Sequence, residues 1–173
     1  MKVDRRQYGD RYERYRHALL EAGIRVLENE TCLFQKEGFQ AAITGLELPL
    51  SCYSHLGREE LQVEEIEERI GERSGDTYRI LMAHNPAYMD VYWEWGADLV
   101  LSGHLHGGVV RLPLVGGVIT PQMQLFPRYS GDMYKGKDGQ SCVVSRGLGT
   151  HTVNVRLYNM AELVSLTFVG KQG

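Results

Sequence analysis

Residues 78 to 108 read YRILMAHNPAYMDVYWEWGADLVLSGHLHGG, and this stretch decides the fold. The apolar run YRILMA predicts a strand that is covered on both faces of a sheet. The pair NP that follows it indicates a helix start, with Asn85 as N-cap and Pro86 at the first helical position. Gly96 ends that short helix, and ADLVLSG predicts a second buried strand. The stretch therefore predicts a β-α-β unit over residues 78 to 104, and with it an α/β fold built on a mixed sheet.

Three histidines follow the ends of these two strands. His84 ends the first strand, and His104 and His106 follow the second. A crossover connection makes the strands parallel, so their carboxyl ends lie at one edge of the sheet, where α/β proteins bind ligands. In an extended backbone, residues two apart point the same way. We therefore expect His104 and His106 to face one pocket while Leu105 turns to the core.

Glycines surround the histidine turn at positions 103, 107 and 108. They permit backbone angles that larger residues resist, and they let a ligand approach closely. Neutral imidazoles are common metal ligands, although a single histidine such as His84 alone is more often a polar residue satisfied by a hydrogen bond. Because three histidines converge on one edge, the sequence predicts a metal site at His84, His104 and His106. We expect His17, His55 and His151 to be surface residues.

The rest of the chain predicts further elements around this unit. Helical spacing of apolar residues from Tyr8 to Glu21 predicts an amphipathic helix that Gly23 closes. Its arginines and tyrosines leave a nucleic-acid patch as the alternative, but nearby acidic residues dilute the charge, so we favour a solvated helix. Residues 24 to 48 predict a strand and a hairpin.

Residues 58 to 71 predict a helix with an acidic solvated face, and an acidic binding surface is the alternative. The glycine- and proline-rich residues 111 to 139 predict a surface loop. QSCVVSRGLG at 140 to 149 and AELVSLTFV at 161 to 169 predict two more strands. The chain therefore reads as strands and helices in alternation, with one long loop.

The length, net charge and cysteine content of the chain argue against several classes of protein. A length of 173 residues fits one domain, and a net charge of −3 gives no reason to expect nucleic acid or anionic membrane as partner. Cys32, Cys52 and Cys142 are odd in number and scattered, which indicates a reducing compartment rather than disulfides. No apolar run approaches a membrane span, and the first sixteen residues, MKVDRRQYGDRYERYR, lack the apolar core that a signal peptide has. We expect a cytoplasmic protein, with an upstream targeting or anchor segment left open.

Four linked motifs resemble a known family. AHNP at 83 to 86, GHLHGG at 103 to 108, RLP at 111 to 113 and SRGLG at 145 to 149 are similar to the carboxy-terminal half of a calcineurin-like metallophosphoesterase. The nearest pattern is that of the bacterial branch with GHxHGGxxRLP. The resemblance spans about residues 20 to 169, and the combined motifs are specific, whereas a lone GHxH is weak. It implies part of a four-layer α-β-β-α sandwich.

The resemblance also implies a metal-dependent reaction. Two divalent metals, manganese, zinc or iron, share a water or hydroxide that attacks a phosphomonoester or phosphodiester. Carried over, His84 and His104 bind the second metal and His106 binds the first, while no catalytic residue is assigned. Arg111 and Arg146 are candidates to contact the phosphate from loops, with loop-pinning or surface arginines as the alternative.

The family's upstream motifs, DxH, GD and GNHD or GNHE, have no match in this sequence. Gly9-Asp10 has the letters of GD, but RRQY precedes it instead of a hydrophobic strand. We therefore expect residues 1 to 173 to form a single, incomplete domain that is inactive or catalytically poor alone. The alternatives are a non-catalytic module that binds a metal or a partner, and a mononuclear zinc hydrolase with three histidines.

The partners expected are a phosphate-ester substrate and another polypeptide surface. The resemblance implies that the amino-terminal half supplies one sheet of the fold, so the inner face of the nearly all-apolar strands in this chain should lack its cover, which predicts self-association or a separate amino-terminal half. Metal content separates the hypotheses, since a full site holds two ions. Tight binding of two ions would point to carboxylate ligands, with Asp10, Glu47 and Asp98 as the first candidates.

Overall fold

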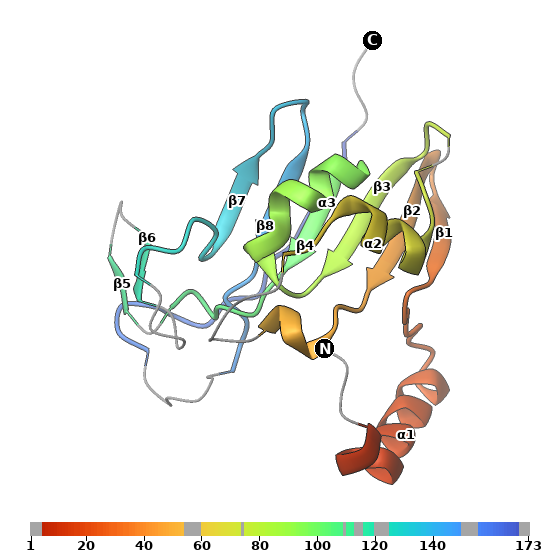
Figure 1. The fold of residues 1–173 in the computed structure, drawn as a ribbon, viewed down its shortest axis with the longest axis horizontal. Coiled ribbons are helices and arrows are strands. Elements are labelled where there is room, and N and C mark those ends of the chain that lie inside the picture. The colour runs from red at the N-terminus through yellow and green to blue at the C-terminus, as the bar shows by residue number, and fades with distance from the viewer. Residues whose placement is uncertain are drawn as a thin grey trace.

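The computed structural model describes residues 5–53, 60–73, 75–108, 110–112, 116–119, 125–149 and 156–169. A six-stranded sheet with the order β1-β2-β3-β4-β8-β7 forms its centre, and β5 and β6 pair in a small second sheet (Figure 1). The elements are α1 (Arg5–Glu21), β1 (Thr31–Lys36), β2 (Phe39–Leu46), the 3-10 turn η1 (Leu50–Tyr53), α2 (Val63–Ile70), β3 (Tyr78–Ala83), the 3-10 turn η2 (Pro86–Tyr88), α3 (Met89–Trp95), β4 (Leu99–Ser102), β5 (Val110–Leu112), β6 (Gly116–Ile119), β7 (Asp132–Lys135) and β8 (Ser141–Val144).

The predicted β-α-β unit is confirmed. β3 and β4 run parallel, and Leu81 lies beside Val100 in the register. The Asn85 side chain accepts a hydrogen bond from the Ala87 backbone N–H at 3.1 Å and so caps η2. β2 and β8 add parallel neighbours, while β1 and β7 pair antiparallel at the two edges. The sheet is therefore mixed, and the fold class is α/β.

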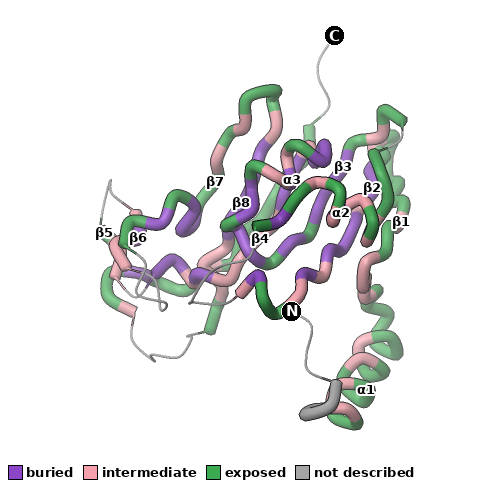
Figure 2. Tube along the Cα trace, in the orientation of Figure 1, coloured by how far each residue is buried: buried purple, intermediate pink, exposed green. Residues whose placement is uncertain are grey.

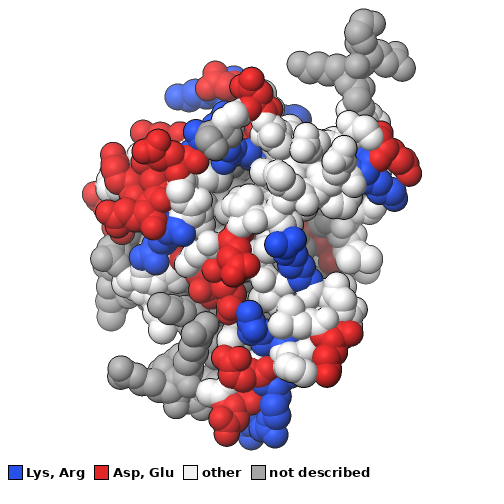
Figure 3. All heavy atoms as spheres, turned by 90° about the vertical axis from the view of Figure 1, so that its right-hand side faces the viewer, with Lys and Arg blue, Asp and Glu red and all other residues white. Residues whose placement is uncertain are grey.

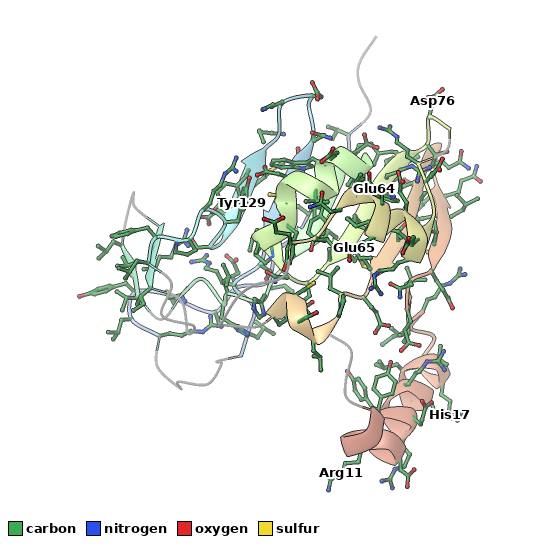
Figure 4. All side chains as sticks on the ribbon, viewed as in Figure 1. Arg11, His17, Glu64, Glu65, Asp76 and Tyr129 are labelled. Carbon is green, nitrogen blue, oxygen red and sulfur yellow. The ribbon has the colours of Figure 1, made fainter. Side chains whose placement is uncertain are left out.

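Helices α2 and α3 cover one face of the sheet (Figure 1). The core between them contains large side chains with no exposed surface, among them Ile66, Leu81, Met89, Tyr92 and Val100. Each such side chain stabilises the fold by roughly 1.5 to 3 kcal/mol relative to an exposed position. The acidic residues of α2, Glu64 and Glu65 among them, lie on the outer side of this layer, and acidic side chains gather on the helix-bearing side of the molecule (Figures 3 and 4).

The second face of the sheet is less completely covered. Along one row of neighbouring strands the register aligns Met82, Leu101, Val143 and Met133 on this face. Met82 is 38% exposed and Met133 is 54% exposed, whereas Val143 is buried. Within the described residues, the carboxy-terminal segment reaches this face, where the Phe168 ring stacks on Phe39 with 4.9 Å between centroids. Most of β1, which forms one edge of the sheet, is exposed to solvent (Figure 2).

Several local predictions need correction. Residues 24 to 29 form no strand, and the expected helix at 58 to 71 begins at Val63, because Gln62 and Glu65 form a capping box there. Residues 58 and 59 lie outside the described part. The expected loop at 111 to 139 contains strand segments, including β7, which pairs with β8.

The segment 161 to 169 is not a strand in the structure. Its apolar residues predict one, but a strand also needs backbone partners on a neighbouring chain segment. Val164 is 39% exposed and Leu163 is 88% exposed, so the segment turns one side toward the protein and the other toward solvent. The outward side chains, Leu163 among them, are therefore not covered by any other described residues of the chain.

The amino-terminal helix α1 is confirmed and projects from the body of the sheet (Figure 1). Gly23, at φ 77°, closes it with a backbone hydrogen bond to the Leu20 carbonyl at 2.9 Å. Across the part of the chain that the structure describes, no helix has the length and apolar character required to cross a membrane.

Candidate metal site

Four parallel strands end at one edge of the sheet. The register places Leu46 at the end of β2 beside Ala83 at the end of β3. It also places Ser102 at the end of β4 beside Val144 at the end of β8. The residues that follow these ends therefore lie at the carboxyl edge, where ligands bind in α/β proteins. His84 is the first residue after β3 and His104 is the second after β4.

The structure brings His84 and His104 together. Their ring centroids lie 5.3 Å apart, with 73° between the ring planes. Two imidazoles that share a tetrahedral zinc ion with bonds of 2.0 to 2.1 Å have centroids about 5 Å apart. The spacing of this pair therefore fits two ligands of one divalent cation.

The backbone of the histidine turn adopts a conformation that is uncommon for residues with a side chain. His104 has φ 68° and His106 has φ 49°, both in the left-handed region. Histidine is among the residues enriched there, and such angles gather at ligand sites. Hydrogen bonds from the Leu105 N–H to the Gly103 carbonyl and from the Gly108 N–H to the Leu105 carbonyl, both 2.8 Å, close the turn.

The turn corrects one step of the sequence argument. We expected an extended backbone at His104 and His106, but both have left-handed angles, and the His104 ring lies beside His84 while the His106 ring contacts the Gly149 carbonyl. Leu105 is 9% exposed, so its predicted burial in the core is confirmed. The reason for the error is that flanking glycines favour a tight turn over continuation of the strand.

His106 contacts a different loop. Its Nδ1 lies 3.1 Å from the Gly149 carbonyl oxygen, and the Asn159 amide donates to the carbonyls of His106 and Gly108 at 2.6 Å each. Since a carbonyl only accepts, a neutral His106 donates from Nδ1 and presents its lone pair at Nε2, the form in which imidazole binds metal. Among the described residues, no three His, Cys, Asp or Glu side chains are grouped closely enough to hold one ion.

Tyr53 packs against the histidine pair. Its ring centroid lies 5.2 Å from that of His104 and 6.3 Å from that of His84. The Asn85 amide donates to the Cys52 carbonyl at 2.9 Å and so holds η1 beside η2. Burial, followed by the charges of Cys52 and Glu47, raises the pKa of Tyr53 to about 12. No sequence motif marks this residue, because tertiary packing alone brings it to the edge.

Arg111 and Arg146 are each held by a carboxylate. Arg111 pairs with Asp132, and Arg146 pairs with Glu162, which also accepts from the Arg146 backbone N–H at 2.8 Å. The hydrogen bond between these two side chains raises the pKa of Arg146 and lowers that of Glu162. Arg146 lies two residues beyond β8, at the carboxyl edge. These contacts agree with the alternative in which the two arginines hold loops in place. That either arginine contacts a phosphate stays a prediction.

The other candidate ligands lie elsewhere. His17 lies on α1, away from the sheet, with Nδ1 3.4 Å from a Glu21 carboxylate oxygen (Figure 4). Asp10 also lies within α1, so the GD at 9 and 10 does not follow a strand. Asp98 precedes β4 and accepts from the Arg79 backbone N–H at 2.7 Å, at the opposite edge from His104. His55 and His151 lie outside the described residues.

A hollow of about 460 Å³ adjoins His84 at the carboxyl edge. Its wall is formed by the ends of β2, β3 and β4, by the loop after α1 and by α1 itself. The lining residues are Tyr12, Val26, Leu27, Glu28, Gly45, Leu46, Glu47, Met82, Ala83, His84, Leu101, Ser102 and Gly103. Glu47, a candidate carboxylate from the sequence, is therefore part of this hollow.

Comparison with known proteins gives partial matches to bacterial proteins. The chain is 28% identical to an uncharacterized protein of Bacillus subtilis, YpbG, over 87% of this chain and 50% of that protein. It is 32% identical to the uncharacterized metallophosphoesterase YkuE of the same organism, over 52% of this chain and 30% of that protein. It is 46% identical to the phosphodiesterase YaeI of Escherichia coli over 43 residues, which are 25% of this chain and 16% of that protein.

The chain spans half or less of the length of these curated relatives. No protein-family profile matches the chain. No solved structure matches it. Two of the relatives above carry the name of a phosphoesterase in their descriptions.

Proposed function

We propose that the chain supplies histidine ligands to the divalent-metal site of a phosphoesterase. In this proposal His84 and His104 bind one metal and His106 binds a second. When bound, two divalent cations such as manganese, zinc or iron activate a water for attack on a phosphate ester and offset the charge on the phosphoryl oxygens. The observation that carries the proposal is the 5.3 Å separation of the His84 and His104 rings at the carboxyl edge.

The chain's own residues hold the backbone of the histidine turn and the ring of His106. The Gly103 N–H donates to the His84 carbonyl at 3.1 Å, which joins the end of β3 to the histidine turn. The Gly149 carbonyl orients the His106 ring through Nδ1. Ligands whose orientation is fixed by such contacts bind a metal more tightly, because less ordering remains to be done on binding.

Arg111 and Arg146 have a secondary place in the proposal. Each guanidinium is paired with a carboxylate, so its first effect is to hold the loops around the histidine turn. Of the two arginines, Arg146 follows the end of β8, and this end lies at the same edge of the sheet as His104. We propose that Arg146 contributes positive charge for a phosphate oxygen, and that Arg111 acts through Asp132 on the loop.

We also propose that the second face of the sheet belongs to an interface. A partner sheet on that face would complete a four-layer α-β-β-α arrangement, and either a second copy of the chain or a separate amino-terminal half would supply it. The support is Met133 and Phe34, which are 54% and 42% exposed on this face, although Val143 beside Met133 is buried. Large apolar side chains that align on one face of a sheet are typical of a covered surface.

Metal titration of the full chain tests the proposed ligands. We expect Mn²⁺ or Zn²⁺ to bind, and we expect the substitutions His84→Ala and His104→Ala to weaken binding by about tenfold or more, at least as much as loss of an outer-shell contact. His17→Ala is the matched control, because His17 is exposed on α1. Isothermal titration calorimetry gives both affinity and stoichiometry. Equal affinities for the wild type and both variants would overturn the assignment.

A single-metal, non-catalytic module is the second candidate. It is favoured by the finding that no third His, Cys, Asp or Glu joins the pair among the described residues. Two neutral imidazoles do not offset the repulsion between two cations, so the isolated chain should bind metal weakly. One weakly bound ion per chain supports this module, whereas two ions per chain support the dinuclear site of a phosphoesterase.

A further inference from the structure

The hollow beside His84 has a mainly apolar wall and two carboxylates. Val26, Leu27, Leu46, Met82 and Leu101 provide the apolar lining. Glu28 and Glu47 provide the acidic groups. A volume of about 460 Å³ lies within the usual range of small-molecule pockets, roughly 300 to 1,000 Å³. The hollow therefore has the size and the walls required for the organic part of a small ligand.

The walls are held in place by specific contacts. A Cβ atom at Gly45 would lie 2.3 Å from the Leu27 carbonyl oxygen, so the glycine allows the loop to pack on the end of β2. The Tyr12 hydroxyl of α1 donates to Glu28, and the Arg16 guanidinium donates to the other Glu28 carboxylate oxygen at 3.2 Å. Glu28 therefore anchors α1 against the loop, and its charge is balanced by Arg16.

Glu47 differs from Glu28. Its backbone N–H donates to the Asn29 side chain at 2.8 Å, which fixes the main chain just beyond β2. Among the described residues, no hydrogen bond or ion pair holds the Glu47 carboxylate itself, and the residue is half-buried. A carboxylate accepts hydrogen bonds and donates none. Glu47 is thus the acceptor that the hollow offers to a ligand.

We infer that the hollow receives the alcohol part of the phosphate ester, and that Glu47 selects esters whose alcohol part carries an ammonium or hydroxyl group. This inference rests on the proposed function, in which His84 and His104 hold the metal that binds the phosphate. An ammonium or hydroxyl group donates to the carboxylate, whereas a second anionic group meets like charge in a partly desolvated site. The apolar wall accommodates the short carbon chain between the two ends.

The test compares three probes that share a phosphate. Phosphoethanolamine has an ammonium tail that can donate hydrogen bonds, phosphoglycolate has an anionic tail, and inorganic phosphate has none. On the full chain with Zn²⁺ we expect phosphoethanolamine to bind at least about tenfold more tightly than phosphoglycolate, a difference of about 1.4 kcal/mol. Glu47→Gln should reduce this ratio to about twofold, because one neutral amide no longer discriminates between the tails. The exposed Glu94→Gln on α3 is the matched control and should retain the wild-type ratio.

The outcomes separate the inference from the proposed function. If inorganic phosphate shows no Zn²⁺-dependent binding, the proposed function fails and the inference falls with it. If phosphate binds but the tails bind equally, or if Glu47→Gln keeps the wild-type ratio, the inference alone is overturned. Glu47→Lys separates a change in selectivity from a loss of folding. This variant should prefer phosphoglycolate, and its circular dichroism spectrum should match that of the wild type.

Discussion

Among single residues, Glu162 links the carboxy-terminal segment to the edge of the sheet. Its carboxylate accepts from the backbone and from the side chain of Arg146, and its side chain is 18% exposed. Hydrogen bonds to an ionised group stabilise a fold more than neutral ones do. The position of residues 156 to 169 against the sheet therefore depends on whether the Glu162 carboxylate is ionised.

The lowered pKa of Glu162 predicts a pH dependence of stability. A carboxyl group whose pKa is lower in the folded state stabilises the fold above its ordinary value of 4.5, and this contribution is lost as the pH falls through the lowered value. Glu162→Gln should therefore cost roughly 1 to 2 kcal/mol at pH 7. The difference from the wild type should shrink below pH 4.5.

Urea unfolding as a function of pH measures this effect. Glu68→Gln, an exposed substitution on α2, is the control and should change stability by less than about 0.5 kcal/mol. A Glu162→Gln penalty that stays constant from neutral to acid pH would show that the ion pair with Arg146 does not stabilise the fold.

Among the elements, the histidine turn depends on Gly107. This residue has φ 75°, and a Cβ atom placed on it would lie 2.5 Å from the Asn159 side-chain oxygen and 2.8 Å from Cγ of Arg146. Asn159 is the residue that fastens the turn by its bonds to the carbonyls of His106 and Gly108. The turn therefore has no room for a side chain at position 107.

Gly107→Ala should destabilise the protein by roughly 2 to 4 kcal/mol, because it combines backbone strain with displacement of Asn159. Gly139→Ala is the control, since Gly139 also has a positive φ, 80°, but nothing lies within 4 Å of a Cβ there. Its cost should be about 1 kcal/mol from the backbone alone. Equal melting temperatures for the two variants would contradict the packing of the turn.

The elements also show which features the sequence can predict. The β-α-β unit was predictable because its signals are local: an apolar run, an Asn-Pro start and a glycine stop. The convergence of His84 and His104 followed from the parallel topology of that unit. The left-handed angles of the turn were not predictable, because glycines permit them without requiring them.

Other features depend on residues far apart in the sequence. Tyr53 reaches the histidine pair through contacts between η1 and η2, and Glu162 reaches Arg146 across the carboxyl edge. The segment AELVSLTFV has the composition of a strand, but composition does not provide a backbone partner. Tertiary contacts therefore decide the parts of the site that local patterns miss.

For the whole molecule, the second face of the sheet predicts association. On this face Met133 is 54% exposed beside the buried Val143, and Phe34 on β1 is 42% exposed. Each hundred square ångströms of apolar surface covered contributes roughly 2.5 kcal/mol before the entropy of association is subtracted. The chain should therefore exceed its monomer mass of 19.6 kDa in light scattering at micromolar concentration.

A charge placed on this face should weaken the association. Met133→Lys inserts an ammonium group into the surface and should shift the mass toward the monomer. Tyr15→Lys on α1 is the control, because Tyr15 is 63% exposed on a helix that projects from the sheet. A wild type that stays at 19.6 kDa at every concentration would argue against an interface on the second face.

The most direct test of the metal site is the histidine-ring NMR spectrum of the full, ¹⁵N-labelled chain during titration with Zn²⁺. Coordination changes the chemical shift of the bound ring nitrogen, so each histidine reports for itself. The account predicts that the ring signals of His84 and His104 shift together as the ion binds, while those of His17 stay in place. Signals of His84 and His104 that do not change at saturating Zn²⁺ would contradict the account.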